Sequence, residues 1–379
     1  MTLPPPLPLS TPSPATAPEP RAVPDPVGFK EDVEQLLHRF LTHKAELTTE
    51  GGRLPNLVDP ITELLAAGGK RVRPVLTMIG WHAAGAAGDP DTALHLAASL
   101  ELFHAFAIIQ DDVMDRSVTR RGRRTVHQTQ TAECERRLPA VGLLPRAGAT
   151  ERFGESAAIL IGDLALLWSD ELFRLGRPTP SQLERVTPLL SAMRFEAIVG
   201  QYLDLEAGTL HRGDLESALL VAHLKAVKYT VEAPLQLGAA LAGADQALMD
   251  ALSAYATPLG EAYQLRDDLL GVFGDPDRTG KPVLDDLREG KATVLITLAL
   301  QQADPAQQDQ LRVFLGSPAL TPDQAEVARR IIEATGARHA VESMITDRYE
   351  RALGALASFE APTAEALRRL AAGAVRRTA

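Results

Sequence analysis

The stretch that decides the fold covers residues 91–116 and reads DTALHLAASLELFHAFAIIQDDVMDR. Its apolar residues recur at three- and four-residue spacing, which predicts one helix of about 39 Å at ~1.5 Å per residue. Asp111 and Asp115 lie one turn apart near its end, so their carboxylates point the same way. The two negative charges repel each other at this spacing, and a shared cation would relieve that repulsion. Because Mg²⁺ prefers oxygen ligands, the stretch predicts a helix that ends in a magnesium site.

The rest of the chain predicts an all-α protein. From Phe29 onward Leu, Ala, Glu and Arg dominate, aromatic residues make up only 4%, and no strand–helix alternation is present. We therefore expect one all-α domain over residues 29–379, with residues 128–153 as a mostly irregular insertion. Residues 1–28 are rich in proline and are expected to form a disordered tail, with a proline-motif ligand as the alternative. Further helices are expected at residues 57–67, 72–87, 155–176, 181–206, 214–242, 245–272, 291–302, 322–335 and 338–357.

Composition narrows the classes of function. The net charge of −10 argues against nucleic acid or an anionic membrane surface as a general partner. The single cysteine, Cys134, excludes an intrachain disulfide and a cysteine-based zinc site. The sequence contains no uninterrupted apolar run of about 18 residues, so no membrane span is expected. It also has no secretory signal pattern, so we expect a cytoplasmic protein.

Basic residues lie beside glycines at two places and predict anion binding. Arg120 and Arg121 lie in an arginine-rich segment directly after the first acids, and arginine forks match phosphate oxygens. Lys70 and Arg73 follow Gly68-Gly69 at a predicted helix N-terminus, which is a natural anion site. The alternative for both groups is a solvated basic surface.

A second acidic motif lies at Asp267 and Asp268, inside another helical pattern. Gln264 precedes them by one turn and shares their environment. If the two aspartate helices face each other, the acids meet at one rim of a cavity, which repulsion keeps open and wet. Lys225 and Tyr229 lie one turn apart in a further helix, where a surface lysine over a half-buried tyrosine is an equal alternative.

The loop after the second acidic motif allows two interpretations. Lys281 and Lys291 lie in glycine-flanked segments where a mobile lid could sit. Residues 275–286 also fit several positions of a calcium-binding loop. Pro276 at the second position and Lys281 at the seventh weaken the calcium interpretation.

Several of these segments together resemble the trans-isoprenyl diphosphate synthases, also called polyprenyl synthetases. The resemblance covers roughly residues 30–360 and implies an isoprenoid synthase-type helical bundle around a deep central cavity, usually as a homodimer. Its implied substrates are isopentenyl diphosphate and allylic prenyl diphosphates. It rests on GGKRVRP at 68–74, DDVMDRSVTRRG at 111–122, GQYLD at 200–204, HLKAVKY at 223–229 and GEAYQLRDDLLG at 260–271.

The resemblance also implies roles for individual residues, position by position. Three Mg²⁺ ions are expected on Asp111, Asp115 and Asp267, supported by Asp112 and Asp268. Contacts to the allylic diphosphate are expected from Arg120, Lys225 and Lys281, with Gln201 and Gln264 near the ionising allyl group. Contacts to isopentenyl diphosphate are expected from Lys70, Arg73, His104 and Arg121.

The sequence departs from the family pattern at three positions. Gly271 replaces the third acid of the second motif, Ala226 replaces a threonine after the lysine, and Arg124 replaces a proline. The first two changes put metal or allyl binding in doubt, and neither removes a predicted ligand.

Product length is expected to depend on the aromatic residues before Asp111. Phe106 lies five residues earlier and Phe103 eight, so both sit deeper on the cavity face. Ordinary core packing is the alternative for both. In the resembling family, one aromatic residue five positions before the acidic motif, next to a small residue such as Ala107, suggests a C20 product, geranylgeranyl diphosphate. The alternative is C15 farnesyl diphosphate.

Two other classes of function remain as alternatives. Ionising terpene cyclases share the first acidic motif, but residues 260–275 lack their second metal motif, and cyclases have no use for a second diphosphate site. A non-catalytic subunit that modulates a prenyl synthase is kept open by Gly271 and Ala226.

Overall fold

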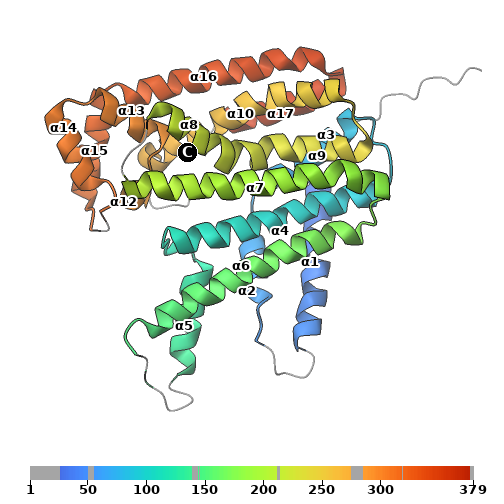
Figure 1. Cartoon of the computed structure of the whole chain (residues 1–379), viewed down its shortest axis with the longest axis horizontal. Coiled ribbons are helices and arrows are strands. Elements are labelled where there is room, and N and C mark those ends of the chain that lie inside the picture. Colours follow the sequence, from blue (N-terminus) through green and yellow to red (C-terminus); the bar gives the residue numbers. More distant parts are fainter. Residues whose placement is uncertain are drawn as a thin grey trace, which may run out of the picture.

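The computed structural model describes residues 26–49, 55–138, 144, 146–210, 214–274, 285–317 and 319–375. This part of the chain is almost entirely helical, with one short β-hairpin (Figure 1), which confirms the all-α prediction. Its elements are α1 (Pro26–Thr49), α2 (Asp59–Ala66), α3 (Val72–Ala83), α4 (Pro90–Met114), β1 (Thr119–Arg120), β2 (Arg123–Arg124), α5 (Val126–Arg137), α6 (Ala149–Leu175), α7 (Pro180–Leu210), α8 (Leu215–Ala222), the π-helix η2 (His223–Glu232), α9 (Ala233–Ala242), α10 (Gln246–Phe273), α12 (Asp285–Glu289), α13 (Val294–Gln302), α14 (Pro305–Phe314), α15 (Pro322–Ala334), α16 (Ala337–Ala355), the 3₁₀ turn η3 (Leu356–Ser358) and α17 (Ala361–Val375).

The long helices α4, α6, α7, α10 and α16 run along the long axis of the molecule (Figure 1). Helices α1, α2 and α5 extend below this bundle, and α13, α14 and α15 close one end of it. Helix α4 packs against α6, α3, α1 and α9. Because α4 is apolar on more than one side, it is covered from several directions.

Helix α4 is, within the described residues, the helix long and apolar enough in composition to cross a membrane. Of its most apolar 18-residue window, 67% is buried inside the molecule. Leu96, Leu100 and Phe103 pack into one hydrophobic cluster and Leu102 and Ile109 into another. We therefore assign α4 as the core helix of the bundle.

A tight hairpin follows α4 and folds its arginines back over the end of that helix. Strands β1 and β2 pair antiparallel, with Arg120 opposite Arg123. The two residues of the turn, Arg121 and Gly122, have positive φ angles of 52° and 71°. Positive φ at both central residues is typical of a type I′ hairpin turn, in which glycine at the second position avoids strain.

The prediction of an irregular segment over residues 128–153 is wrong. Helix α5 occupies Val126–Arg137, and α6 already begins at Ala149. The sequence of α5 is mainly polar and has almost no apolar periodicity, and only Val126 and His127 of this helix are buried. Helix α5 packs along α6, where a Cβ added at Gly154 would lie 2.9 Å from the backbone nitrogen of Thr131. Close packing against a neighbouring helix thus holds a segment that has little pattern of its own.

The segment predicted as one helix over residues 214–242 is helical throughout, but its middle is a π-helix. Glycines allow two neighbouring helices to approach it closely: a Cβ at Gly200 of α7 would lie 2.7 Å from Lys225 Cα, and one at Gly260 of α10 would lie 2.6 Å from Val227 Cγ1. π-Helical turns inside α-helices are frequent at functional sites. Helices α14 and α17 lie outside the predicted segments.

Candidate active site

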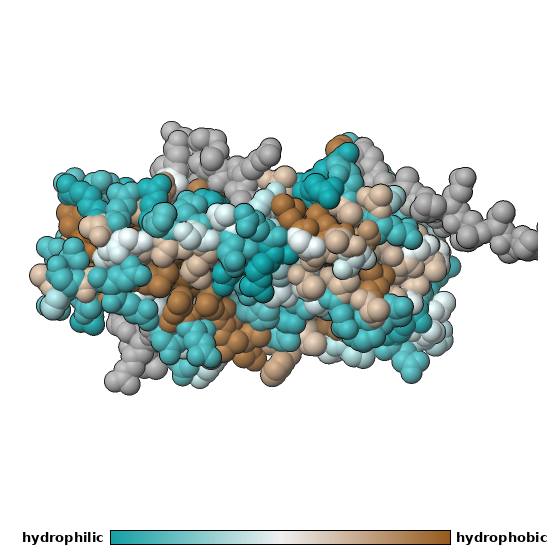
Figure 2. Space-filling view, turned by 90° about the horizontal axis from the view of Figure 1, so that it is seen from above, coloured by the Kyte–Doolittle hydropathy of each residue, from teal (hydrophilic) through white to brown (hydrophobic). Residues whose placement is uncertain are grey.

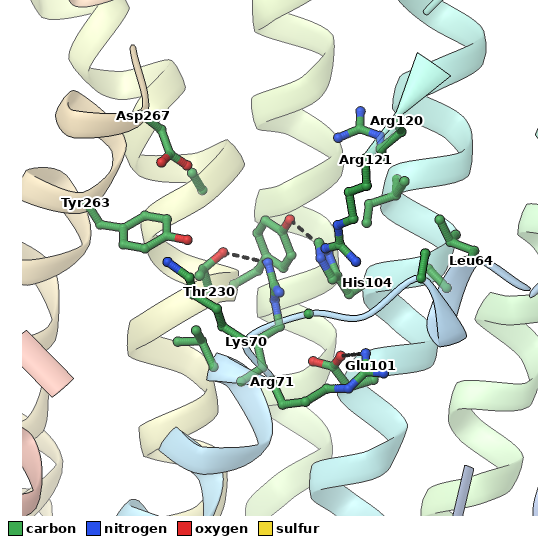
Figure 3. A pocket seen from close by; sticks show the side chains of 18 of the residues that line it. Leu64, Lys70, Arg71, Glu101, His104, Arg120, Arg121, Thr230, Tyr263 and Asp267 are labelled. Atoms are coloured by element: carbon green, nitrogen blue, oxygen red, sulfur yellow. Dashed lines mark hydrogen bonds and ion pairs between the residues drawn. The ribbon is translucent and has the colours of Figure 1, made fainter. Parts of the chain in front are cut away.

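A cavity of about 690 Å³ opens between the start of α3, the second half of α4, η2 and α10 (Figure 3). Arg120 and Arg121 of the hairpin lie over it, and the α2–α3 loop, residues 67–71, forms its floor in this view. Asp267 and Tyr263 of α10 lie on the side opposite His104 of α4. The cavity therefore joins segments from six separate parts of the sequence, the last of which contains Glu289 and Lys291.

One wall of the cavity is basic. Arg73 is buried, its guanidinium lies 4.4 Å from the centre of the Tyr229 ring, and it donates a hydrogen bond to Thr230 Oγ1 at 2.8 Å. The Nε atom of Arg73 is buried without a hydrogen-bond partner among the described residues. Lys70 is exposed at the cavity, on the loop that leads into α3 and Arg73. A buried guanidinium held without a carboxylate is suited to an anionic ligand.

Arg121 and His104 complete this wall. Arg121 donates a hydrogen bond to Gly68 O, so the hairpin is tied to the α2–α3 loop. His104 lies with Nδ1 3.5 Å from the Tyr229 hydroxyl. Burial and the nearby charges of Arg73 and Arg121 hold the pKa of His104 well below its usual range, so the ring stays neutral. The structure thus brings Lys70, Arg73, His104 and Arg121 together, as the resemblance implies.

The first acidic motif lies next to the rim of the same cavity, which Arg120 forms here, and is paired with cations. Neither its three acids nor Lys225 are among the described residues that line the cavity. Lys225 Nζ lies 3.0 Å from Asp111 Oδ1 and 2.6 Å from Asp204 Oδ2. Arg120 contacts Asp111 at 3.2 Å and Asp112 at 2.7 Å. These contacts join α4, the hairpin, α7 and η2 into one charged cluster.

The third acid of this motif has a partner of its own. Lys291 Nζ lies 2.8 Å from Asp115 Oδ2 and 2.8 Å from Glu289 Oε2. The Asp115 oxygen is within ion-pair distance but is not aligned for a hydrogen bond. Ser117 donates a hydrogen bond to Glu289 Oε1 at 3.1 Å. The segment around residues 289–291 is thereby fixed to the end of α4.

Burial and neighbouring charges shift the pKa values of these acids in opposite directions. Burial alone would raise the pKa of Asp111, but the charges of Lys225, Lys291 and Arg120 outweigh it and hold that pKa well below its usual range. Burial raises the pKa of Asp112 against the opposing charge of Arg120. Burial and the nearby Asp111 raise the pKa of Asp115. Asp111 is therefore firmly ionised, and the neighbouring Asp115 is the carboxyl whose ionised form an added cation would stabilise most.

The second acidic motif lies across the cavity on α10. Asp267 and Gln264 line the cavity, whereas Asp268 is buried and accepts a hydrogen bond from Gln264 Nε2 at 2.8 Å. Gly271 and Ala226, the two departures from the family pattern, also line the cavity. The missing acid and the missing hydroxyl would both have faced this space.

The acids fit Mg²⁺ better than a metal held entirely by protein. Among the described residues, no group of three His, Cys, Asp or Glu side chains forms a ready-made metal cage. Mg²⁺ usually takes one or two carboxylates and completes its octahedron with water and phosphate. Asp111 and Asp115 on one rim, with Asp267 opposite, offer such an incomplete set of oxygen ligands.

Not every predicted residue lies on the cavity wall. Lys281 and most of the candidate calcium loop fall outside the described residues. Gln201 is half-buried, with its amide nitrogen 3.6 Å from Met114 Sδ, and is not among the described residues that line the cavity. Phe103 and Phe106 also lie behind the wall: their ring centres are 5.6 Å apart, and Phe103 packs edge-on against Tyr229 at 5.9 Å.

Sequence reasoning missed two charged partners of this cluster. Asp204 ends the GQYLD segment, one helical turn after Gly200, so its presence on the lysine-facing side of α7 could have been inferred from spacing. Glu289, in contrast, is the last residue of the five-residue helix α12, which is too short to carry a periodic signal. Its role as a partner of Lys291 is visible only in the tertiary structure.

Comparisons with known proteins agree with this geometry. Residues 55–334 match the polyprenyl synthetase family. The geranylfarnesyl diphosphate synthase of Aeropyrum pernix is 32% identical over 305 residues, 80% of this chain and 87% of that protein. The (2E,6E)-farnesyl diphosphate synthase of Mycobacterium bovis is 33% identical over 274 residues, 71% of this chain and 68% of that protein.

A solved structure extends the similarity to the fold. The geranylgeranyl pyrophosphate synthase from Corynebacterium glutamicum, complexed with isoprenyl diphosphate and magnesium, has a TM-score of 0.87 at 37% sequence identity. The superposition covers 93% of this chain and 99% of that one. The chain therefore belongs to the polyprenyl synthetase family of trans-prenyltransferases.

Proposed function

We propose that the chain condenses isopentenyl diphosphate with an allylic diphosphate and that its main product is geranylgeranyl diphosphate, C20. The observation that carries the proposal is the presence of two unlike anion sites next to each other, joined through Arg120. One is the mainly basic wall of the cavity, with Arg73 and Arg121. The other combines acids with Lys225 and Arg120, as expected where a metal ion and a diphosphate bind together.

In this proposal Asp111, Asp115 and Asp267 hold Mg²⁺, as three ions. Bound Mg²⁺ neutralises charge on the leaving diphosphate. Lys225 and Arg120, which the acids hold at the rim, supply fixed positive charge where that diphosphate leaves. The structure of the Corynebacterium glutamicum relative contains magnesium and isoprenyl diphosphate, which supports this assignment.

The basic wall holds the second substrate by its diphosphate, so that its double bond faces the allyl group. Fixing both reactants in one cavity replaces an encounter in solution with an oriented step. The double bond attacks the allylic carbon as the C–O bond to diphosphate breaks, and a proton then leaves the new chain, for which the released diphosphate is the nearest base. The neutral His104 lines the wall without adding a further charge near the reacting carbons.

The C20 product rests on the aromatic pair before Asp111. Phe106 is half-buried and packs on Phe103, which in turn packs on Tyr229 at the cavity wall. In the proposal this stack limits the depth available to a growing chain. The matched relatives carry names for farnesyl, geranylgeranyl and geranylfarnesyl products, so product length is the part of the proposal that most needs measurement.

The test is a turnover assay of the purified chain with Mg²⁺, an allylic diphosphate and labelled isopentenyl diphosphate. We expect elongated prenyl diphosphates that end mainly at C20, and longer products from Phe106→Ala. A hydrocarbon product would indicate a cyclase, and no turnover would favour a modulatory subunit. Unchanged product length in Phe106→Ala would remove the aromatic pair as the length determinant.

We also propose that the chain forms a homodimer through α6 and α7. Leu160 and Leu167 on α6 are 61% and 64% exposed, and Phe195 and Tyr202 on α7 are 68% and 65% exposed. Their spacing of seven residues places each pair on one side of its helix. On the face seen from above, Figure 2 shows further hydrophobic residues in patches among hydrophilic ones. Exposed apolar patches of this kind mark interaction surfaces.

Sedimentation or light scattering tests the dimer. Leu160→Glu combined with Leu167→Glu should give monomers, because a buried unpaired charge is costly at an interface. Val313→Glu, on α14 and 70% exposed, is the matched control and should leave the mass unchanged. A monomeric wild-type chain, or a dimer that survives the α6 changes, would contradict this interface.

A further inference from the structure

We propose that Arg71 and Glu101 form a positioning clamp for the α2–α3 loop and that this clamp sets the affinity for isopentenyl diphosphate. The inference rests on the proposed function, because the loop carries Lys70 and leads into Arg73. Neither Arg71 nor Glu101 is among the residues to which the sequence assigned a role. Both are buried at the base of the cavity (Figure 3).

Arg71 ties the loop to three helices at once. Its Nη1 donates to Glu101 Oε2 on α4 at 2.8 Å, and its Nη2 donates to Leu65 O near the end of α2 at 2.7 Å. Its Nε donates to Glu34 Oε1 on α1 at 3.2 Å. All three guanidinium nitrogens are therefore engaged by protein, so the side chain fixes the loop and is not directed at a ligand.

The backbone of the loop supports the same interpretation. Arg71 precedes α3 with a φ of 49°, a left-handed conformation that is costly for a residue with a side chain and persists only where surrounding contacts hold it. Figure 3 shows Lys70 and Arg71 leaving the loop in different directions, with Arg71 turned toward Glu101. The clamp thus holds the turn that separates the cavity-facing Lys70 from the anchoring Arg71.

Glu101 makes the clamp testable by the sign of its effect. Its side chain is 3% exposed, and its Oε1 is buried without a hydrogen-bond partner among the described residues. It lies on α4 three residues before His104, on the same side of the helix. A carboxylate beside an anion site repels the anion, so electrostatics alone predict that Glu101→Gln tightens diphosphate binding. The clamp predicts the opposite, because the neutral amide holds Arg71 less strongly.

The experiment compares Arg71→Met, Arg71→Lys and Glu101→Gln in the full chain, with steady-state kinetics for each substrate. We expect KM for isopentenyl diphosphate to rise about tenfold or more in Arg71→Met, and less in Arg71→Lys and Glu101→Gln, because the ligand must order the loop. The kcat and the KM for the allylic diphosphate should change about twofold at most. A general loss of stability would not produce this selective change.

Arg185→Met is the matched control. Arg185 also donates from several nitrogens, to Ala240 O at 2.7 Å, Leu241 O at 3.2 Å and Ser181 Oγ at 2.6 Å, and ties α7 to α9 away from the cavity. The Arg185→Met variant should have a lower melting temperature and an unchanged KM for both isopentenyl diphosphate and the allylic diphosphate.

Each outcome has a defined meaning. A lower or unchanged KM for isopentenyl diphosphate in Glu101→Gln would overturn the clamp, as would an equal change in both KM values. If Arg71→Met does not fold, Arg71→Lys and Glu101→Gln carry the test. If the wild-type chain does not condense the two substrates, the proposed function fails, and calorimetric binding of isopentenyl diphosphate to the same variants decides the clamp separately.

Discussion

Replacing Gly200 with alanine would test whether the close approach of α7 to the π-helix positions Lys225, the lysine proposed to contact the leaving diphosphate. The added Cβ would lie 2.7 Å from Lys225 Cα and 2.8 Å from the Leu224 carbonyl carbon. The nearest atom is the backbone nitrogen of Lys225 at 2.4 Å, and an ordinary contact begins at 3.4 Å, so the two backbones must separate by about 1 Å. All three neighbouring atoms belong to the backbone and cannot rotate away. The substitution therefore moves Lys225 relative to Asp204, which lies on the same helix as Gly200.

The expected effect is on turnover more than on folding. Overpacking typically costs about 1–3 kcal/mol, and alanine recovers about 0.5–1 kcal/mol through helix propensity. A domain with a stability of roughly 5–15 kcal/mol tolerates this net change. Misplacement by about 1 Å can cost on the order of 100-fold in rate, so we expect kcat to fall roughly 10- to 100-fold in Gly200→Ala.

Gly208→Ala supplies the matched control on the same helix. A Cβ at Gly208 would meet only Gly290 O at 3.9 Å, an ordinary contact. We expect wild-type turnover and an equal or slightly higher melting temperature. The assay is steady-state condensation with both diphosphates, accompanied by thermal unfolding of each variant. Wild-type kcat in a folded Gly200→Ala would refute the reasoning, since the clash would then be absorbed without moving the lysine.

Three further substitutions test other parts of the site. Asp204→Asn removes a carboxylate 2.6 Å from Lys225 Nζ. The kcat should fall about tenfold or more, on the scale of one charge-assisted hydrogen bond. Glu206→Gln, at an exposed position of the same helix, should leave kcat unchanged. His104→Gln should flatten the pH dependence of stability. Burial and the nearby arginines lower the pKa of His104 in the folded state. Below about pH 6.5 the unfolded chain therefore takes up a proton that the folded chain does not, so stability is lost as the pH falls. That loss reaches at most about 1.4 kcal/mol at pH 5.5, and urea unfolding at pH 7.5 and 5.5 should show it in the wild type and not in the variant. Gly271→Asp should leave magnesium-dependent turnover nearly unchanged, and a large gain in kcat would mean that the missing acid limits the natural chain.

The sequence alone was sufficient for the helical core and for most of the cavity wall. The spacing of apolar residues predicts α4 closely, because its periodicity is carried within one helix. One-turn spacing also places Asp111 beside Asp115 without further information. The four residues of the basic wall were found through short motifs, and the tertiary structure places all four on the lining of one cavity.

Helix α5 was not predictable in the same way. Its residues are mainly polar, and its stability comes from contact with α6, so its own sequence has no strong helical signal. The π-helix was hidden for a related reason. The extra residue per turn is defined by hydrogen bonding in the folded chain, and the close approach of Gly200 and Gly260 becomes visible only once α7 and α10 are placed beside it.

The amino-acid sequence by itself determined the helical class, the family and the candidate ligands for metal and phosphate, because these depend on short-range spacing and side-chain chemistry. The tertiary structure alone decided which charges meet: Lys225 lies between Asp111 and Asp204, and Arg71 pairs with Glu101. Lys225 and Asp111 are 114 residues apart, and their pairing depends on how α4, α7 and η2 pack together. A helical pattern specifies which face of a helix is buried, whereas the partner of that face is set by the packing of the whole bundle.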